Sequence, residues 1–195
     1  MPNLPSEEIF DEDVLLTNLN EIQRQNKLLE NRRLDVEDGL VLESIGNESW
    51  RYPVFTVEME TGTGKTYVYL RTAYELRKHY GFRKFIVIVP GIAIYEGVIK
   101  SVEITREHFK SLYNNEHMSV IAYDSDQISK LRDFANSQFL QVMIMTMASF
   151  NRYSNNIYKR TEKLPGEKIP IRYVQETRPI LILDESQNYD SQTSK

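Results

Sequence analysis

The stretch METGTGKTYVYL, residues 59–70, places glycine, threonine and lysine at a spacing that could hold a phosphate group. Gly62 and Gly64 allow backbone conformations that are closed to other residues, and they let amide groups approach an anion. Lys65 can reach the outer phosphates of a nucleotide, and the Thr66 hydroxyl can coordinate Mg²⁺. The sequence therefore predicts a nucleotide-binding loop made of Thr61, Gly62, Thr63, Gly64, Lys65 and Thr66.

The first position of this loop departs from the usual pattern G-x-x-x-x-G-K-[ST], because Met59 stands where the first glycine is expected. That position lies before the loop, where backbone amides matter more than a side chain. The alternative interpretation is a glycine turn that merely precedes a helix. A strand before the loop and a helix after it favour the phosphate loop, since the motif requires that context.

A pair of acidic residues ends the apolar run ILILDESQ, residues 180–187. Phosphoryl transfer to water needs Mg²⁺ on the outer phosphates and a carboxylate that orients the attacking water. Asp184, directly after the apolar run, suits the metal, and Glu185 suits the water as a general base. A solvated acidic turn is the alternative, and the phosphate loop upstream disfavours it.

The elements that position these residues alternate between strands and helices. We expect an amphipathic helix over 13–30, helices over 69–80 and 94–112, and an irregular excursion over 151–178. The expected strands are 55–59, 85–89, a segment around 121, 139–146 and 180–184. This alternation predicts an α/β fold, a parallel sheet with helices on both faces, preceded by an N-terminal helical segment. Ligands of such folds bind at the carboxyl ends of the strands, where both motifs lie.

Composition limits the partners that this chain can have. The 195 residues contain no cysteine, which excludes disulfides and thiolate metal sites. The start is not a signal peptide and the apolar runs are too short to cross a bilayer, so a cytoplasmic protein is expected. Residues 1–50 carry a net charge of −8 and residues 51–195 a net charge of +4. This balance argues against tight DNA binding, which usually needs a dense basic patch.

Several motifs occur in the order found in one known family. FTVEMETGTGKTYVYL, MTMASFNR and RPILILDESQ, within a region from about 55 to 188, resemble the restriction (Res) subunit of type III restriction-modification enzymes. The resemblance implies membership of helicase superfamily 2, with a RecA-like first motor lobe as the fold. It also implies ATP and Mg²⁺ as cofactors, DNA as a substrate, a modification (Mod) subunit as a partner, and a separate nuclease domain in the complete enzyme.

The resemblance also implies roles for individual residues. The ATP-binding motif matches 61–66, and the absence of glycine at Met59 is usual in this superfamily. The D-E-x-Q box matches Asp184, Glu185 and Gln187, with Gln187 in the coupling position and Ser186 where proline is common. The positions that contact the DNA backbone match Pro90, Gly91 and Thr146. Gly91 and Tyr95 replace a common serine and arginine, which removes expected phosphate contacts.

The domain organisation expected from these matches is an acidic N-terminal helical segment, 1–50, and an ATP-binding motor domain, 51–195, that is truncated after the D-E-x-Q box. The hypothesis is therefore a first motor lobe that is inactive alone and binds DNA weakly. Two alternatives stay open. One is a non-catalytic remnant that binds only nucleotide or a partner. The other is a lobe of a different superfamily 2 DNA-dependent ATPase, such as a type I restriction motor.

Overall fold

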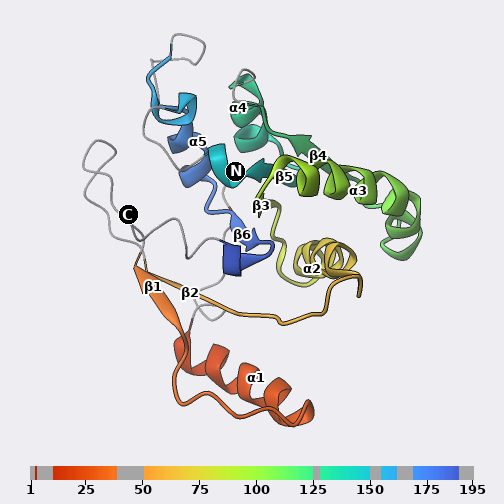
Figure 1. Ribbon diagram of the computed structural model, residues 1–195, viewed down its shortest axis with the longest axis vertical. Helices are drawn as coiled ribbons and strands as arrows, with labels where there is room; N and C mark the ends of the chain where they lie inside the picture. Colours follow the sequence, from red (N-terminus) through yellow and green to blue (C-terminus); the bar gives the residue numbers. More distant parts are fainter. Residues whose placement is uncertain are drawn as a thin grey trace. The chain divides into compact units, whose positions relative to one another are not determined.

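The computed structural model describes residues 3, 11–38, 51–124, 128–149, 155–161 and 169–188 (Figure 1). The chain forms two compact units. We call residues 5–60 the N-terminal unit, and residues 1–4 together with 61–195 the sheet unit. The domain boundary expected between residues 50 and 51 stays a prediction.

The sheet unit is built on four parallel strands in its described part. They are β3 (Lys84–Val89), β4 (Met118–Ala122), β5 (Leu140–Thr146) and β6 (Ile180–Leu183), in the spatial order β4-β5-β3-β6. All six residues of β3 are buried, as are the first six of β5. Such continuous burial is expected of strands that are covered on both faces, and their sequences are correspondingly apolar.

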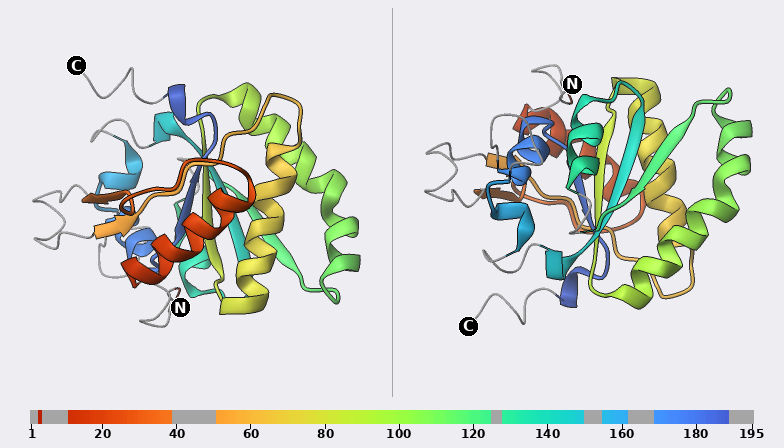
Figure 2. Two further views of the ribbon diagram at one scale, coloured as in Figure 1. Left: turned by 90° about the horizontal axis from the view of Figure 1, so that it is seen from below. Right: turned by 90° about the horizontal axis from the view of Figure 1, so that it is seen from above.

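Four helices cover the two faces of this sheet. They are α2 (Lys65–Tyr80), α3 (Ile92–Leu112), α4 (Ser129–Asn136) and α5 (Pro170–Glu176). The pair α2 and α3 lies on one face, and the pair α4 and α5 lies on the other (Figure 2). The predicted fold class, an α/β parallel sheet with helices on both faces, is confirmed.

The N-terminal unit contains a helix and a short hairpin. Helix α1 (Glu12–Gln25) begins at Asp11, whose carboxylate accepts hydrogen bonds from the backbone amides of Asp13 and Val14. Strands β1 (Val36–Asp38) and β2 (Arg51–Pro53) pair antiparallel. The predicted N-terminal helix is confirmed, but it ends at Gln25, earlier than expected, because Lys27 takes a left-handed conformation.

The strand expected over 55–59 is absent, and that prediction was wrong. These residues have no regular secondary structure, and the sheet of the described sheet unit begins with β3 instead. The β-branched and aromatic residues of this segment produced the expectation, but Phe55 is 49% exposed and Val57 74%. A strand propensity without a neighbour to pair and pack against does not make a strand.

Two short helices were missed in the sequence. Helix α4 follows β4, and helix α5 lies in the region expected to be irregular. Pro170 interrupts a helix only in its interior, and here it occupies the first turn of α5, where its missing amide costs nothing. Ile171 and Val174 of this helix are buried.

Asn3 ties together the amino end of β3 and the turn between α5 and β6. Its side-chain oxygen accepts hydrogen bonds from the backbone amides of Arg83 and Lys84, at 2.7 and 2.9 Å. Its amide nitrogen donates to the carbonyl oxygens of Lys84 and Arg178, and its backbone amide donates to Thr177. Asn3 is buried, so these contacts satisfy polar groups that water does not reach.

Lys84, the first residue of β3, is fully buried. Its amine donates to the carbonyl oxygens of Phe134 and Ser137 and to the side-chain oxygen of Gln141, so it joins β3 and β5 to the end of α4. Burial lowers the pKa of this amine to about 8. We assign Lys84 a structural role, because its donors are taken up by protein oxygens.

Candidate active site

The glycine loop has a backbone that only glycine adopts without strain. Gly62 has a φ of 82° and Gly64 a φ of 92°, and both angles fall in the left-handed region. A Cβ atom at Gly64 would approach only Tyr67 Cβ, at 3.9 Å, so glycine is required there by conformation and not by lack of space. The two glycines therefore have the backbone form that the sequence led us to expect, although the strand expected directly before the loop is absent.

Helix α2 begins directly after the loop and leaves its positive end open to an anion. Gly64 is its N-cap residue and has no side chain to accept the first amides. The first turn contains no acidic residue, whereas the last turn carries Arg77, Lys78 and His79. The first amides and the helix dipole are thus available for a negatively charged ligand.

Lys65 and Glu185 join the two motifs directly. The Lys65 amine forms an ion pair with the Glu185 carboxylate, and both side chains are about three-quarters buried. Gln187 donates a second hydrogen bond to the same carboxylate. These bonds, from Lys65 first, hold the pKa of Glu185 below its ordinary value. The loop and the D-E-x-Q box thus meet at one edge of the sheet.

Asp184 lies at the carboxyl end of β6, and its backbone amide continues the pairing with β3 by donating to the Ile88 carbonyl oxygen at 2.9 Å. The residue is only 9% exposed. Burial raises the pKa of its carboxyl group, and the neighbouring Glu185 raises it further, while Lys65 lowers it. A buried carboxylate with this pKa shift gains from a bound cation, which would compensate its charge.

Glu185 has a φ of 55°, an unusual conformation for a residue other than glycine. This conformation turns the chain immediately after β6. Asp184 and Glu185 therefore both lie in the turn at the carboxyl end of the strand. Strained backbone of this kind is common at functional sites. Sequence alone gave no indication of it.

The positions matched to DNA-backbone contacts gather at the same edge. Val89 pairs with Thr146, so Pro90 and Gly91, which follow β3, lie next to the end of β5. The Thr146 hydroxyl is 3.3 Å from that of Ser149.

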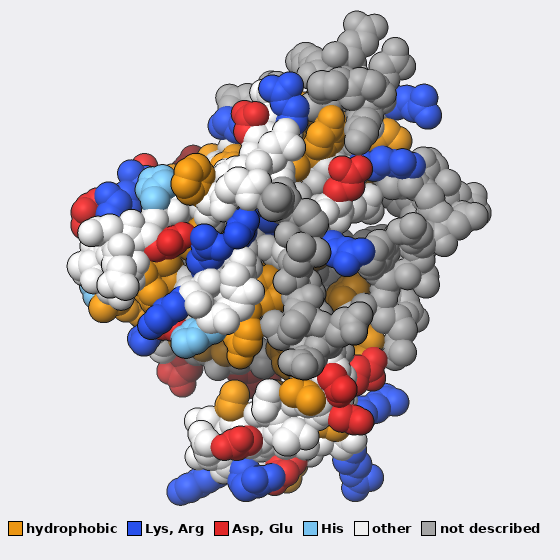
Figure 3. Space-filling view, turned by 180° about the vertical axis from the view of Figure 1, so that it is seen from behind, with side chains coloured by type: hydrophobic (Ala, Val, Ile, Leu, Met, Phe, Trp, Pro, Cys, Tyr) orange, Lys and Arg blue, Asp and Glu red, His pale blue; other side chains and the backbone are white. Residues whose placement is uncertain are grey.

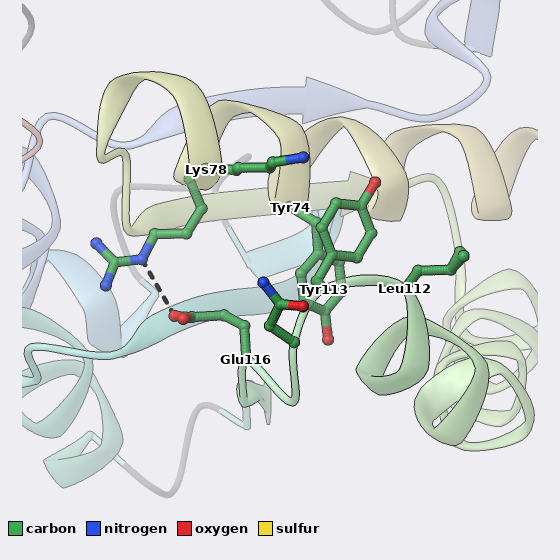
Figure 4. Close-up of a pocket in the computed structure, with 7 residues that line it drawn as sticks. Tyr74, Lys78, Leu112, Tyr113 and Glu116 are labelled. Carbon is green, nitrogen blue, oxygen red and sulfur yellow. Dashed lines mark hydrogen bonds and ion pairs between the residues drawn. The ribbon is translucent and has the colours of Figure 1, made fainter.

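A separate pocket of about 320 Å³ lies at the far ends of α2 and α3 from the loop (Figure 4). The rings of Tyr74 and Tyr113 stack there at 4.6 Å, and Arg77 forms an ion pair with Glu116 at 3.1 Å. None of the predicted site residues lines this pocket. The pocket therefore lies apart from the candidate site at the loop edge.

The described surface shows no dense basic patch on the face in Figure 3, where Lys and Arg side chains are separated by acidic and apolar ones. This agrees with the mixed charge of the sequence. Among the described residues, no helix is long and apolar enough to span a membrane. The same part of the chain has no cluster of three or more His, Asp or Glu side chains that could hold a metal.

A parallel sheet, a glycine loop that opens a helix, and an acidic pair directly after strand β6 define the fold class of a P-loop helicase-type α/β domain. The family model for "Type III restriction enzyme, res subunit" matches residues 18–194. The chain belongs to this family.

Three relatives are Res subunits of type III restriction-modification enzymes. That of StyLTI from Salmonella typhimurium is 34% identical over 152 residues, which is 68% of this chain and 15% of the relative. That of EcoP15I from Escherichia coli is 26% identical over 166 residues, 76% of this chain and 17% of the relative. That of EcoPI from Escherichia phage P1 is 27% identical over 160 residues, which is 73% of this chain and 16% of the relative. The matched region thus spans about a sixth of the length of these relatives.

Proposed function

We propose that this chain is the ATP-binding first motor lobe of a type III Res subunit. The observation that carries the proposal is the ion pair between Lys65 and Glu185, which brings the glycine loop and the D-E-x-Q box together. In this proposal residues 61–66 hold the phosphates of ATP. The amides at the start of α2 donate to the phosphate oxygens, and Lys65 neutralises the outer ones.

The residues at this edge fit Mg²⁺. Asp184 offers a buried carboxylate and Thr66 a hydroxyl, and Mg²⁺ in nucleotide sites is commonly held by one or two carboxylates plus the phosphates. Bound Mg²⁺ would neutralise the charge that develops on the outer phosphates. Thr66 and Asp184 are the proposed ligands.

Glu185 is the proposed general base, and in the structure it also forms the ion pair with Lys65. A phosphate that draws Lys65 away frees the carboxylate to orient water and accept its proton. Gln187, which also contacts Glu185, is well placed to couple the state of the site to motion of the chain.

The activity of a complete enzyme is a further part of this proposal. Following its family, the protein would translocate on DNA at the expense of ATP and cleave it together with a Mod subunit, in the cytoplasm. Pro90, Gly91 and Thr146 are the proposed contacts to the DNA backbone. Their small number, and the lack of a hydroxyl and a guanidinium at Gly91 and Tyr95, predict weak binding that falls as salt rises.

Calorimetry with a non-hydrolysable ATP analogue and Mg²⁺ tests the proposal. We expect weak binding to the wild-type chain and an affinity at least about tenfold lower for Lys65→Ala, because the phosphates lose their cation. Lys78→Ala is the matched control, since it removes the same charge from the far end of α2. Equal affinities of the wild type and Lys65→Ala would show that the loop is not the site.

A further inference from the structure

The hydroxyl of Tyr69 is buried and makes no hydrogen bond of ordinary geometry. Tyr69 is 9% exposed. A buried hydroxyl without a partner is less favourable than one that is paired, and phenylalanine would fill nearly the same space without this cost. A ligand bound at the loop edge would explain the tyrosine, because it would give this hydroxyl a hydrogen-bond partner.

The position of Tyr69 on α2 directs this hydroxyl toward the nucleotide loop. Tyr69 follows Lys65 by four residues and Thr66 by three, so it lies on the same face of the helix. Side chains of a helix lean toward its N-terminus, which here is the loop. Burial raises the pKa of Tyr69; a hydrogen-bonding interaction with the Thr66 side chain, which falls short of ordinary geometry, lowers it, and the Asp184 carboxylate raises it further. The hydroxyl thus lies close to both residues proposed as metal ligands.

We propose that Tyr69 is a positioning residue for the metal, and that its hydroxyl donates a hydrogen bond to the oxygen ligands of Mg²⁺ when nucleotide is bound. The acceptor is either the Asp184 carboxylate or a water on the metal, since Mg²⁺ keeps several waters in such sites. This inference rests on the proposed nucleotide function. It adds a residue outside both the loop motif and the D-E-x-Q box.

Such a role explains why a tyrosine is tolerated at a buried position. Groups that contact metal ligands orient them, and their loss typically lowers metal affinity by about 10- to 100-fold. A bound metal would give the hydroxyl a well-formed hydrogen bond and so offset the cost of its burial.

The experiment titrates Mg²⁺ against a fixed concentration of a fluorescent, non-hydrolysable ATP analogue, and repeats the binding with EDTA. For Tyr69→Phe we expect the Mg²⁺ concentration at half-maximal binding to rise about tenfold. Binding in EDTA should be unchanged, and the ligand-free protein should be as stable as the wild type or more stable. Tyr123→Phe is the matched control, because Tyr123 also has a buried hydroxyl without a partner but lies at the end of β4. Its Mg²⁺ dependence should equal that of the wild type.

An unchanged Mg²⁺ midpoint in Tyr69→Phe would overturn the inference. So would an equal loss of binding with Mg²⁺ and with EDTA, since Tyr69 would then shape the loop and not serve the metal. Unfolding of Tyr69→Phe would also overturn it, because the hydroxyl would have to be satisfied in the free protein. In each case, binding that Lys65→Ala still weakens would leave the proposed function standing. Failure of the wild type to bind nucleotide at all would remove both.

Discussion

Lys65 cannot serve its carboxylate partner and a phosphate equally well at the same time. Its amine is paired with Glu185, and the pair is only partly exposed, so solvent screens it incompletely. A nucleotide bound as proposed would compete with this pair for the amine. The affinity of the proposed site would then depend on Glu185, which belongs to the other motif.

The substitution Glu185→Gln should tighten nucleotide binding by about two- to fivefold, because Lys65 loses its competing charge. The measurement is calorimetry with the non-hydrolysable ATP analogue and Mg²⁺. Glu107→Gln, which removes an exposed charge from α3, is the control and should leave the affinity unchanged. Weaker binding by Glu185→Gln would mean that the carboxylate supports the ligand, and would contradict the competition described above.

Among the elements, α2 and α3 are held to one another by aromatic rings. Phe109 of α3 stacks on Tyr67 and Tyr74 of α2, with ring centroids at 4.9 and 5.2 Å, and Tyr74 in turn stacks on Tyr113. The rings run along α2 from the turn after the loop toward the far end of the helix. They fix the helix whose first amides are proposed to bind phosphate.

Truncating the centre of this aromatic stack should destabilise the protein strongly. Tyr74 is 2% exposed, and we expect Tyr74→Ala to lower the free energy of unfolding by about 3 kcal/mol or more, because it leaves a cavity between the helices. Tyr80→Ala, at a position 53% exposed on the same helix, should change it by at most about 0.5 kcal/mol. Urea denaturation followed by circular dichroism measures both. Similar losses in the two variants would show that the stack contributes little.

Those elements with long, regular patterns were predictable from the sequence. The apolar run 85–89 is β3, and the periodic segment after the loop is α2. The segment 55–59 misled because its residues favour a strand, whereas pairing depends on neighbours that a local pattern does not contain. Helices α4 and α5 were not predicted, because their eight and seven residues give too few turns for a clear hydrophobic periodicity.

The candidate site was predictable in its membership and not in its details. The loop and the D-E-x-Q residues carry their chemistry in their residue types, so spacing and order identified them. The ion pair of Lys65, the left-handed Glu185 and the unpaired hydroxyl of Tyr69 arise from the folded arrangement. Long-range contacts of this kind leave no periodic trace in the chain. The functional roles of these residues stay predictions.

At the scale of the whole molecule, the relatives are about six times longer than the matched region, so the match covers one part of each relative's chain. The resemblance implies that such motors close ATP between two lobes and that an arginine from the second completes the site. In other phosphate-loop hydrolases such an arginine contributes about 10³ to 10⁵ in rate. One lobe by itself would bind nucleotide without completing that arrangement.

We therefore expect the purified 195-residue chain to release phosphate from ATP at a negligible rate, with no stimulation by DNA or by a Mod subunit. The measurement is phosphate release under each of these conditions, with the Glu185→Gln variant as the control for contaminating activity. Robust release that requires DNA and disappears in Glu185→Gln would contradict this. It would mean that a single lobe, or two copies together, forms a complete site.

Asn3 makes the sheet unit discontinuous along the chain. The polypeptide contributes residues 1–4 to that unit, leaves it, and returns at residue 61, so the N-terminal unit is topologically an insertion. A fragment cut at residue 61 would contain every motif and every strand of the sheet, yet it would leave the amides of Arg83 and Lys84 without their acceptor. Replacing residues 5–60 with a linker would keep Asn3 in the chain. A shortened version of this protein should therefore retain Asn3 and its hydrogen bonds as well as the sequence motifs.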